Sequence, residues 1–370
     1  MPHLVGKIFL KRILRMTVRR AALALLGAIL GSVPATSFAA DKSPAGQQVA
    51  SVPQGGDQKL AELKAAYKRP KSIPFSASNP YSPQKVALGK LLYFDTRLSG
   101  SNLLSCASCH NPGFGWGDGQ PLGIGQGMQV LPRRTPTILN GAWGELFFWD
   151  GRADSLEQQA LGPIQGAGEM NQNLDALVQE LSKIEGYRKR FDEAFPGEGI
   201  TGPNITKAIA TYERTIISSR APFDDWIDGN EGAISASAKR GFVLFNTKAR
   251  CAQCHNSWRF TDDSFHDIGL PDVSDPGRAK QLPDIEKMQH AFKTPGLRDI
   301  GRRAPYMHNG SMATLEEVVD HYIHGGVQRP SLSEEMKPIA LSDAERTDLL
   351  EFLHALTGPL NPVVLPVLPR

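Results

Sequence analysis

Hydrophobic residues recur along much of this chain at spacings of three and four, which is the period of an amphipathic helix. Capping residues and Gly or Pro breaks bound these segments. The pattern predicts nine helices, over residues 58–68, 83–94, 155–164, 174–184, 186–195, 204–217, 235–245, 314–323 and 342–356. No segment alternates regularly enough to predict a strand, so the sequence predicts a mainly α fold.

Two long stretches, 111–140 and 270–295, are rich in Gly and Pro and are predicted to form irregular loops. The 370 residues leave room for two domains, and the content of 41% hydrophobic and 21% charged residues is that of an ordinary globular protein. We expect one domain over 58–220 and a second over 221–370, the second ending in a Pro-rich tail after Gly358.

The N-terminal region has the pattern of a secretory signal peptide. Six Lys and Arg residues lie within the first 20 positions, an apolar run follows over 21–30, and Ser37-Phe38-Ala39 is a small-x-small cleavage site. The apolar run is short for a membrane span, although an uncleaved anchor is the alternative. We expect a cleaved signal peptide over 1–39, a flexible leader over 40–57, and a periplasmic protein without a stable membrane span.

Cleavage there would change the sign of the net charge. The whole chain has a formal net charge of +3, but the predicted signal peptide holds six of the 41 Lys and Arg residues and none of the 38 Asp and Glu residues. The remainder, with 35 basic residues, has a net charge of about −3. Because the excess of basic residues lies in the predicted signal peptide, the composition of the remaining chain predicts no nucleic-acid partner.

All four cysteines lie in two copies of one motif, Cys106-Ala-Ser-Cys109-His110 and Cys251-Ala-Gln-Cys254-His255. Two thiols at this spacing can form thioether bonds to the vinyl groups of a haem, and the following His is the usual axial ligand of its iron. A redox dithiol or a zinc site is the alternative, but zinc would need ligands from segments 145 residues apart. The motifs predict two covalently bound haems c, ligated by His110 and His255.

The supply of a second axial ligand differs between the two motifs. No His lies between His110 and His255, and the only Met residues in that interval are Met128 and Met170. We therefore expect the first haem to have an open coordination site, with closure by Met128 as the alternative.

The second haem has many candidate ligands in one segment, namely Met307, His308, Met312, His321, Tyr322 and His324. A capping box from Thr314 to Glu317 predicts the start of a helix on which Tyr322 shares the apolar face. The spacing alone leaves open whether Tyr322 is a ligand or a core residue with a locally bonded hydroxyl.

Over residues 81–356 the chain resembles the bacterial di-haem cytochrome c peroxidases and MauG-type enzymes. The resemblance rests on both haem motifs and on four further segments, Arg134-Thr-Pro-Thr-Ile-Leu-Asn140, Phe148-Trp-Asp-Gly-Arg152, Gln159-Ala-Leu-Gly-Pro-Ile164 followed by Glu169-Met170, and Ala304-Pro-Tyr-Met-His-Asn-Gly310. It implies two cytochrome c-like haem domains with long irregular loops.

The resemblance also implies roles for individual residues. Trp149 matches the tryptophan that lies between the two haems as an electron relay. Gln159, Pro163 and Glu169 match residues on the open face of the first haem, where Glu169 would be the acid–base group. Such a role suits a glutamate in an apolar pocket, because cleavage of a peroxide O–O bond needs a proton to be taken and returned.

Two positions favour the MauG-like branch. Typical peroxidases of the family have a distal His in the loop after the first haem motif, where this chain aligns near Gln126. They also have a Met ligand at the second haem, where counting from His308 leads to Tyr322. We expect Tyr322 to be the sixth ligand of the second haem, with Met312 as its main rival.

One departure from the family concerns calcium. Members commonly hold Ca²⁺ between the domains with an Asn side chain at the position of Arg134 and with backbone carbonyls near Arg303 and Pro305. Two arginines are poor neighbours for a dication. We therefore expect no calcium there, with compensation by Asp or Glu from elsewhere in the chain as the alternative.

These observations are compatible with three alternative functions. The first is a MauG-like oxidase that uses hydrogen peroxide to oxidise a partner protein. The second is a peroxidase that detoxifies hydrogen peroxide with electrons from a small periplasmic cytochrome or copper protein. The third is a non-enzymatic electron carrier, which would require a sixth ligand that the first domain hardly offers.

Overall fold

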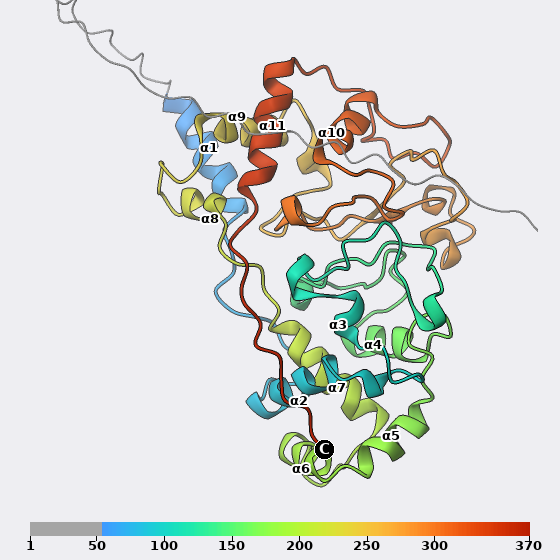
Figure 1. Ribbon diagram of the computed structural model, residues 1–370. Helices are drawn as coiled ribbons and strands as arrows, with labels where there is room; N and C mark the ends of the chain where they lie inside the picture. Colours follow the sequence, from blue (N-terminus) through green and yellow to red (C-terminus); the bar gives the residue numbers. More distant parts are fainter. Residues whose placement is uncertain (1–53) are drawn as a thin grey trace, which may run out of the picture. The chain divides into compact units, whose positions relative to one another are not determined.

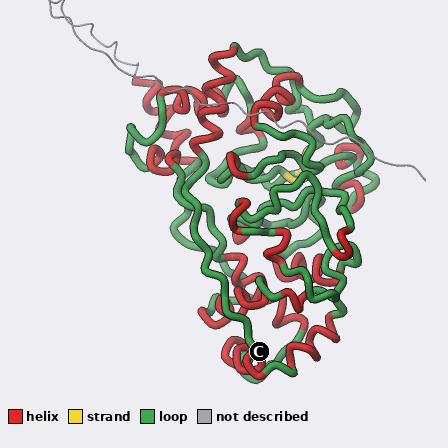
Figure 2. Tube along the Cα trace, in the orientation of Figure 1, coloured by secondary structure: helices red, strands yellow, loops and turns green. Residues whose placement is uncertain are grey.

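The computed structural model describes residues 54–370, in which helices dominate (Figures 1 and 2). The predicted signal peptide and nearly all of the predicted leader lie outside the described residues. The helices are α1 (Gln54–Ala66), α2 (Pro83–Tyr93), α3 (Cys106–Cys109), α4 (Leu156–Gln165), α5 (Leu174–Ser182), α6 (Glu185–Ala194), α7 (Gly202–Arg214), α8 (Pro222–Ile227), α9 (Ala236–Asn246), α10 (Leu315–His324) and α11 (Asp343–Ala355). The predicted mainly α fold is confirmed.

The helices differ from the predicted ones chiefly at their ends. The first begins at Gln54, inside the segment predicted to be a flexible leader. The six-residue α8 begins just after the expected domain limit at residues 220 and 221, and it has Pro222 in its first turn, where the missing N–H of proline costs nothing. The capping box of Thr314 and Glu317 is present at the start of α10.

The two Gly/Pro-rich stretches are mostly irregular, as predicted, with short 3₁₀ turns. The second contributes a strand, β2 (Phe292–Lys293), which pairs antiparallel with β1 (Phe265–His266). Each strand has two residues, so no alternating pattern could have shown it.

The hydrophobic core falls into two clusters. One is built from α2, α4, α5, α6 and α7, and the other from α8, α9, α10 and α11. Tyr67, just after α1, belongs to the second cluster although it precedes the first in sequence. Near the other end of the chain, Leu368 packs against the first cluster and Arg97 donates to the Pro369 carbonyl at 3.1 Å. A segment near each end of the described chain therefore packs against the cluster formed by the other half of the sequence. The domain limits at residues 220 and 221 stay a prediction.

Each cluster contains one close helix crossing that depends on a glycine. In α2, a Cβ on Gly89 would lie 2.0 Å from the Ala208 carbonyl oxygen of α7. In α9, a Cβ on Gly241 would lie 1.9 Å from the Asp348 carbonyl oxygen of α11. These distances exclude any side chain, so both helix pairs pack backbone to backbone at the crossing.

The loops that follow the haem motifs form a structural repeat, which we define as residues 134–163 and 293–322, separated by 159 positions. Phe148 and Met307 are equivalent, with φ of 68° and 73°. An isolated β-bridge flanks each of them, Phe147 to Ala153 in one copy and Tyr306 to Met312 in the other. Within the repeat, Trp149 corresponds to His308 and Pro163 to Tyr322.

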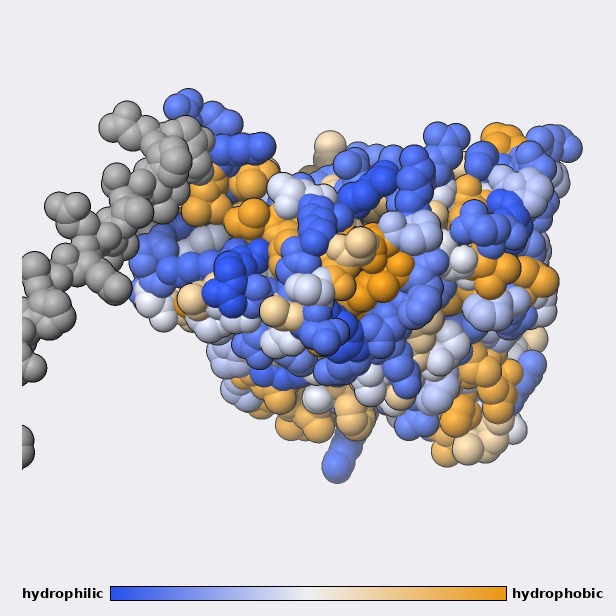
Figure 3. All heavy atoms as spheres, turned by 90° about the horizontal axis from the view of Figure 1, so that it is seen from above, coloured by the Kyte–Doolittle hydropathy of each residue, from blue (hydrophilic) through white to orange (hydrophobic). Residues whose placement is uncertain are grey.

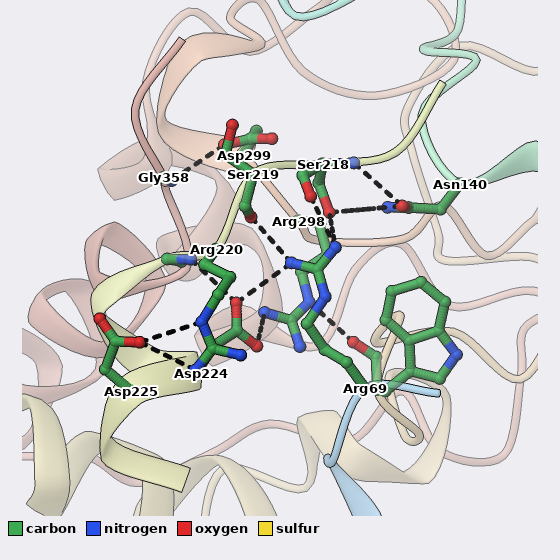
Figure 4. A network of polar contacts seen from close by, with 12 residues as sticks. Arg69, Asn140, Ser218, Ser219, Arg220, Asp224, Asp225, Arg298, Asp299 and Gly358 are labelled. Atoms are coloured by element: carbon green, nitrogen blue, oxygen red, sulfur yellow. Dashed lines mark hydrogen bonds and ion pairs between the residues drawn. The ribbon is translucent and has the colours of Figure 1, made fainter. Parts of the chain in front are cut away.

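Residues 218–225 link the two hydrophobic clusters along the chain. A buried polar network connects this linking segment with both repeats (Figure 4). Asp224 of α8 pairs with Arg298 at 2.7 Å and with Arg69 at 3.3 Å. Arg69 also donates to the carbonyls of Ser218 and Ser219. These charge-assisted bonds hold the linking segment against the loop that carries Arg298.

No helix within residues 54–370 has the length and apolar character needed to cross a membrane.

Candidate active site

The first haem motif is folded as the attachment chemistry requires. Cys106 and Cys109 are the first and last residues of α3, one helical turn apart. The Nδ1 atom of His110 lies 3.3 Å from the carbonyl oxygen of Trp116. With Nδ1 donating to that carbonyl, Nε2 of His110 is free to ligate iron.

The second motif repeats this arrangement on a 3₁₀ turn from Cys251 to Gln253. The Nδ1 atom of His255 lies 2.9 Å from the Phe260 carbonyl oxygen. Trp116 and Phe260 present these carbonyls with φ of 62° and 60°. Burial lowers the pKa of both histidines, which favours the neutral imidazole that a metal needs.

The four thiols fit haem attachment better than the alternatives. All four are free and half-buried. Burial raises the pKa of Cys109 to about 11 and that of Cys251 to about 12. A redox dithiol requires a thiol of lowered pKa, so these environments disfavour that alternative. The residues of each motif therefore fit a covalently held haem.

Glu169 lies in the loop after α4, close to the first motif. Its negative charge contributes to the raised pKa of Cys109. Burial raises the pKa of Glu169 itself, and the charge of Arg152 offsets this only in part. The backbone N–H of Gln126 donates to the Glu169 carbonyl at 2.8 Å, so the loop that could have carried a distal ligand instead supports the glutamate. Burial thus favours the protonated form of this carboxyl group more than water does.

Gln159 and Pro163 are one turn apart on α4, and both are half-buried. The Pro163 carbonyl accepts from the Met170 N–H at 3.0 Å, which turns the chain back after α4. No hydrogen bond joins Gln159 to Glu169 in residues 54–370, so the three residues share a region rather than a bonded network.

Tyr322 lies on α10 beside the second motif. Burial raises the pKa of its hydroxyl, and the nearby Cys254 and Cys251 raise it further. Its counterpart in the first repeat is Pro163, which has no group that can bind a metal. Its rival Met312 is partly buried against the second cluster. Figure 3, a view from above, shows hydrophobic residues gathered within a hydrophilic surround.

Trp149 lies where the two repeats meet. Its Nε1 donates to the Arg134 carbonyl at 2.8 Å, and its ring meets the ring of His308 edge to face at 6.4 Å. His308 is in turn stacked on Phe292 at 3.5 Å. His308 was considered above only as an iron ligand, and its contact with Trp149 could not be foreseen without the fold.

Two features go beyond the sequence analysis. Arg134 and Arg303, which were named there only as poor neighbours for calcium, are buried next to each other, and the Nε atom of each lacks a hydrogen-bond partner among residues 54–370. Glu213 on α7 is buried beside the first motif, where its charge affects Cys106. Gly89 contacts Ala208 of α7, and Gly241 makes the equivalent contact with Asp348 of α11. Counted from these two contacts, Glu213 on α7 corresponds to Leu353 on α11. A comparison of the two helices would therefore have marked the buried carboxyl group as unusual.

Known proteins share both the sequence and the fold. A family model described as di-haem cytochrome c peroxidase matches residues 83–232. The methylamine utilization protein MauG of Methylorubrum extorquens is 54% identical over 84% of this chain and 89% of its own length. MauG of Methylophilus methylotrophus is 50% identical over 82% and 91%.

More distant relatives include peroxidases. The cytochrome c551 peroxidase of Pseudomonas aeruginosa is 35% identical over 81% of this chain and 86% of its own. Among solved structures, a MauG-like protein associated with microbial copper homeostasis aligns with a TM-score of 0.73 and 32% identity, over 79% of this chain and 95% of that one.

Proposed function

Because this chain belongs to the di-haem cytochrome c peroxidase family, on the branch of MauG, we propose that hydrogen peroxide reacts at the first motif and that a periplasmic protein is oxidised through the second. The chain is a di-haem oxidoreductase of the peroxidase type. Cys106 and Cys109 would hold one haem, with His110 on its iron. Cys251 and Cys254 would hold the other, with His255 on its iron.

The observation that carries the proposal is the unequal pair Pro163 and Tyr322. They occupy equivalent positions in the two repeats, yet only Tyr322 offers an atom that binds iron. Met128, the other candidate for closing the first site, has a side chain that is 76% exposed. One site would stay open for a small substrate, and the other would be closed for electron transfer.

A bound haem supplies an iron that exchanges electrons with peroxide and with its neighbours. The residues around the first motif would manage the protons. The Glu169 carboxylate would take the proton from the attacking peroxide oxygen and return it to the leaving oxygen. Gln159 would orient the peroxide through its amide group. Pro163, which lacks an N–H, would keep that face apolar.

Trp149 would carry electrons between the two sites. Its ring contacts His308 of the other repeat, and its Nε1 is fixed on the Arg134 carbonyl. A bonded Nε1 keeps the indole in one orientation, as a relay between fixed centres requires.

We further propose export through cleavage after Ala39, and an oxidised partner that belongs to methylamine utilization, as the names of the two MauG relatives suggest. The region of Arg134 would hold no calcium, because a buried guanidinium already supplies positive charge there.

Spectroscopy of the purified holoprotein tests this proposal. Mass spectrometry should show two haems covalently attached, and the ferric spectrum should contain one high-spin and one low-spin haem. A spectrum with two low-spin haems would support an electron carrier instead.

A detoxifying peroxidase is the second candidate, because relatives at 34–37% identity are cytochrome c peroxidases. Stopped-flow assays separate the two. Fast peroxide turnover with a reduced small cytochrome or copper protein would favour detoxification. Slow turnover coupled to oxidation of a protein from the methylamine pathway would favour the MauG-like activity.

A further inference from the structure

The described chain contains two adjacent buried cations with no anionic partner. Arg134 is 6% exposed and Arg303 is 5% exposed. Arg133 and Arg152 both pair with Asp150, but neither Arg134 nor Arg303 forms an ion pair with any residue from 54 to 370. The Nε atoms of both are buried and have no hydrogen-bond partner within that same range of residues.

The other donors of the two guanidinium groups are directed at backbone carbonyls. Nη2 of Arg134 donates to the Arg303 carbonyl at 2.7 Å, and Nη1 donates to that of Thr135 at 3.3 Å. Nη2 of Arg303 donates to the Gly296 carbonyl. Carbonyl groups solvate a guanidinium but leave its charge uncompensated. Burial of a charge in the protein interior is strongly unfavourable unless an anion is near.

The pair lies between the two haem-motif loops. The backbone N–H of Arg134 donates to the His308 carbonyl at 2.7 Å, and its own carbonyl accepts from Trp149. The side chain of Arg303 packs against the loop between His110 and Trp116, where a Cβ on Gly115 would lie 3.0 Å from its Cγ. An anion that bound both groups would therefore touch the segments of both sites.

The charge environment of the two arginines favours the binding of an anion. Burial lowers the pKa of both arginines, and the charge of Arg134 contributes to the lowering for Arg303, to about 10. Asp118, Asp299 and Tyr306 raise these pKa values only in part, and the Asp118 carboxylate is bonded to Thr135 at 2.6 Å.

We propose that Arg134 and Arg303 form a carboxylate-binding site for haem propionates, which fixes the two haems relative to Trp149. This deepens the proposed function and rests on its two haems. Each haem has two propionate carboxylates, and a guanidinium binds a carboxylate with matched hydrogen bonds. The free Nε donors are the atoms available for these bonds.

A high-resolution crystal structure of the wild-type holoprotein tests the proposal directly. We expect a propionate oxygen within about 3 Å of Nε of Arg134 or of Arg303. Haems bound at both motifs with their propionates away from the two arginines would overturn this inference alone. Absence of a covalent haem would overturn the proposed function instead.

Resonance Raman spectra of variants give a second test. Arg134→Gln and Arg303→Gln should each shift the propionate bending bands and lower the potential of at least one haem, because a cation near a haem favours its reduced form. Arg134→Lys, which keeps the charge, should restore most of the potential. Arg214→Gln is a matched control, since Arg214 is equally buried but pairs with Glu157 at 2.7 Å.

The control variant should leave the propionate bands of the wild type in place. If both glutamine variants load two haems and retain wild-type propionate bands, the arginines do not bind the propionates.

Discussion

Trp149 and His308 are equivalent residues of the two repeats, and their rings meet edge to face with the centroids 6.4 Å apart. Reciprocal backbone bonds hold them together. The Lys293 N–H donates to the Trp149 carbonyl at 2.8 Å, and the Arg134 N–H donates to the His308 carbonyl at 2.7 Å. The structure thus brings the same position of each repeat to one point between the two motifs.

Replacement of Trp149 should separate peroxide chemistry from electron transfer. In Trp149→Phe we expect peroxide still to react at the first haem, because the residues of that face are unchanged. Turnover with an external donor should fall about tenfold or more, a barrier increase of at least about 1.4 kcal/mol.

The measurement is stopped-flow spectroscopy of both haems. Trp143→Phe is the control, because Trp143 is also half-buried and contacts Trp258 edge to face at 4.7 Å. Equal rates of oxidation of the second haem in the wild type and in Trp149→Phe would exclude the relay.

Glu169 should control the pH dependence of the peroxide reaction. Burial raises its pKa, and only the carboxylate form accepts a proton, so the wild-type rate should fall as pH decreases through that raised pKa. Glu169→Gln should react about 10²- to 10⁴-fold more slowly and should lose this limb of the pH profile. The exposed Glu145→Gln should behave as the wild type. A slow variant that kept the wild-type pH profile would point to another base.

Tyr322 and Met312 can be distinguished by the spectrum of the second haem. We expect Tyr322→Phe to convert a low-spin ferric haem to a different species, since the phenol oxygen is the atom lost. Met312→Leu, a change of similar volume, should leave the spectrum as it is. The reverse pattern in electron paramagnetic resonance spectra would assign the ligand to Met312.

Glu213 should make the protein less stable as pH rises. Burial raises its pKa from an ordinary 4.5 to about 8, and the charge of Glu157 adds to this while Arg214 opposes it. The folded state therefore binds more protons than the unfolded state between these pH values, and its free energy of unfolding falls across that window. Glu213→Gln should remove the fall, which is of the order of a few kcal/mol.

Denaturant unfolding of the holoprotein at pH 5 and pH 8 measures this effect. Glu213→Leu, which copies the residue at the equivalent Leu353, should behave like Glu213→Gln. The exposed Glu351→Gln on α11 should retain the wild-type pH dependence. A wild-type pH dependence in both Glu213 variants would mean that the carboxyl is paired or hydrated in solution.

The sequence by itself determined the helical class, the two haem motifs and the family resemblance. Helix periodicity, the capping box at Thr314 and the spacing of Cys, Cys and His are local properties, so they can be read within a few residues. The peroxidase resemblance rested on motifs that the relatives bear out, at 54% and 50% identity to MauG. The short α8 and the two strands were too brief to leave a periodic signal.

Only the tertiary structure decided what lies next to what. Trp149 and His308 are 159 positions apart, and Arg134 and Arg303 are 169 apart, so neither contact has a local signature. Both depend on how two loops fold back on each other, and a contact between distant segments is set by packing and backbone pairing along the whole chain. The sequence contained two similar halves, and the fold placed their equivalent residues face to face.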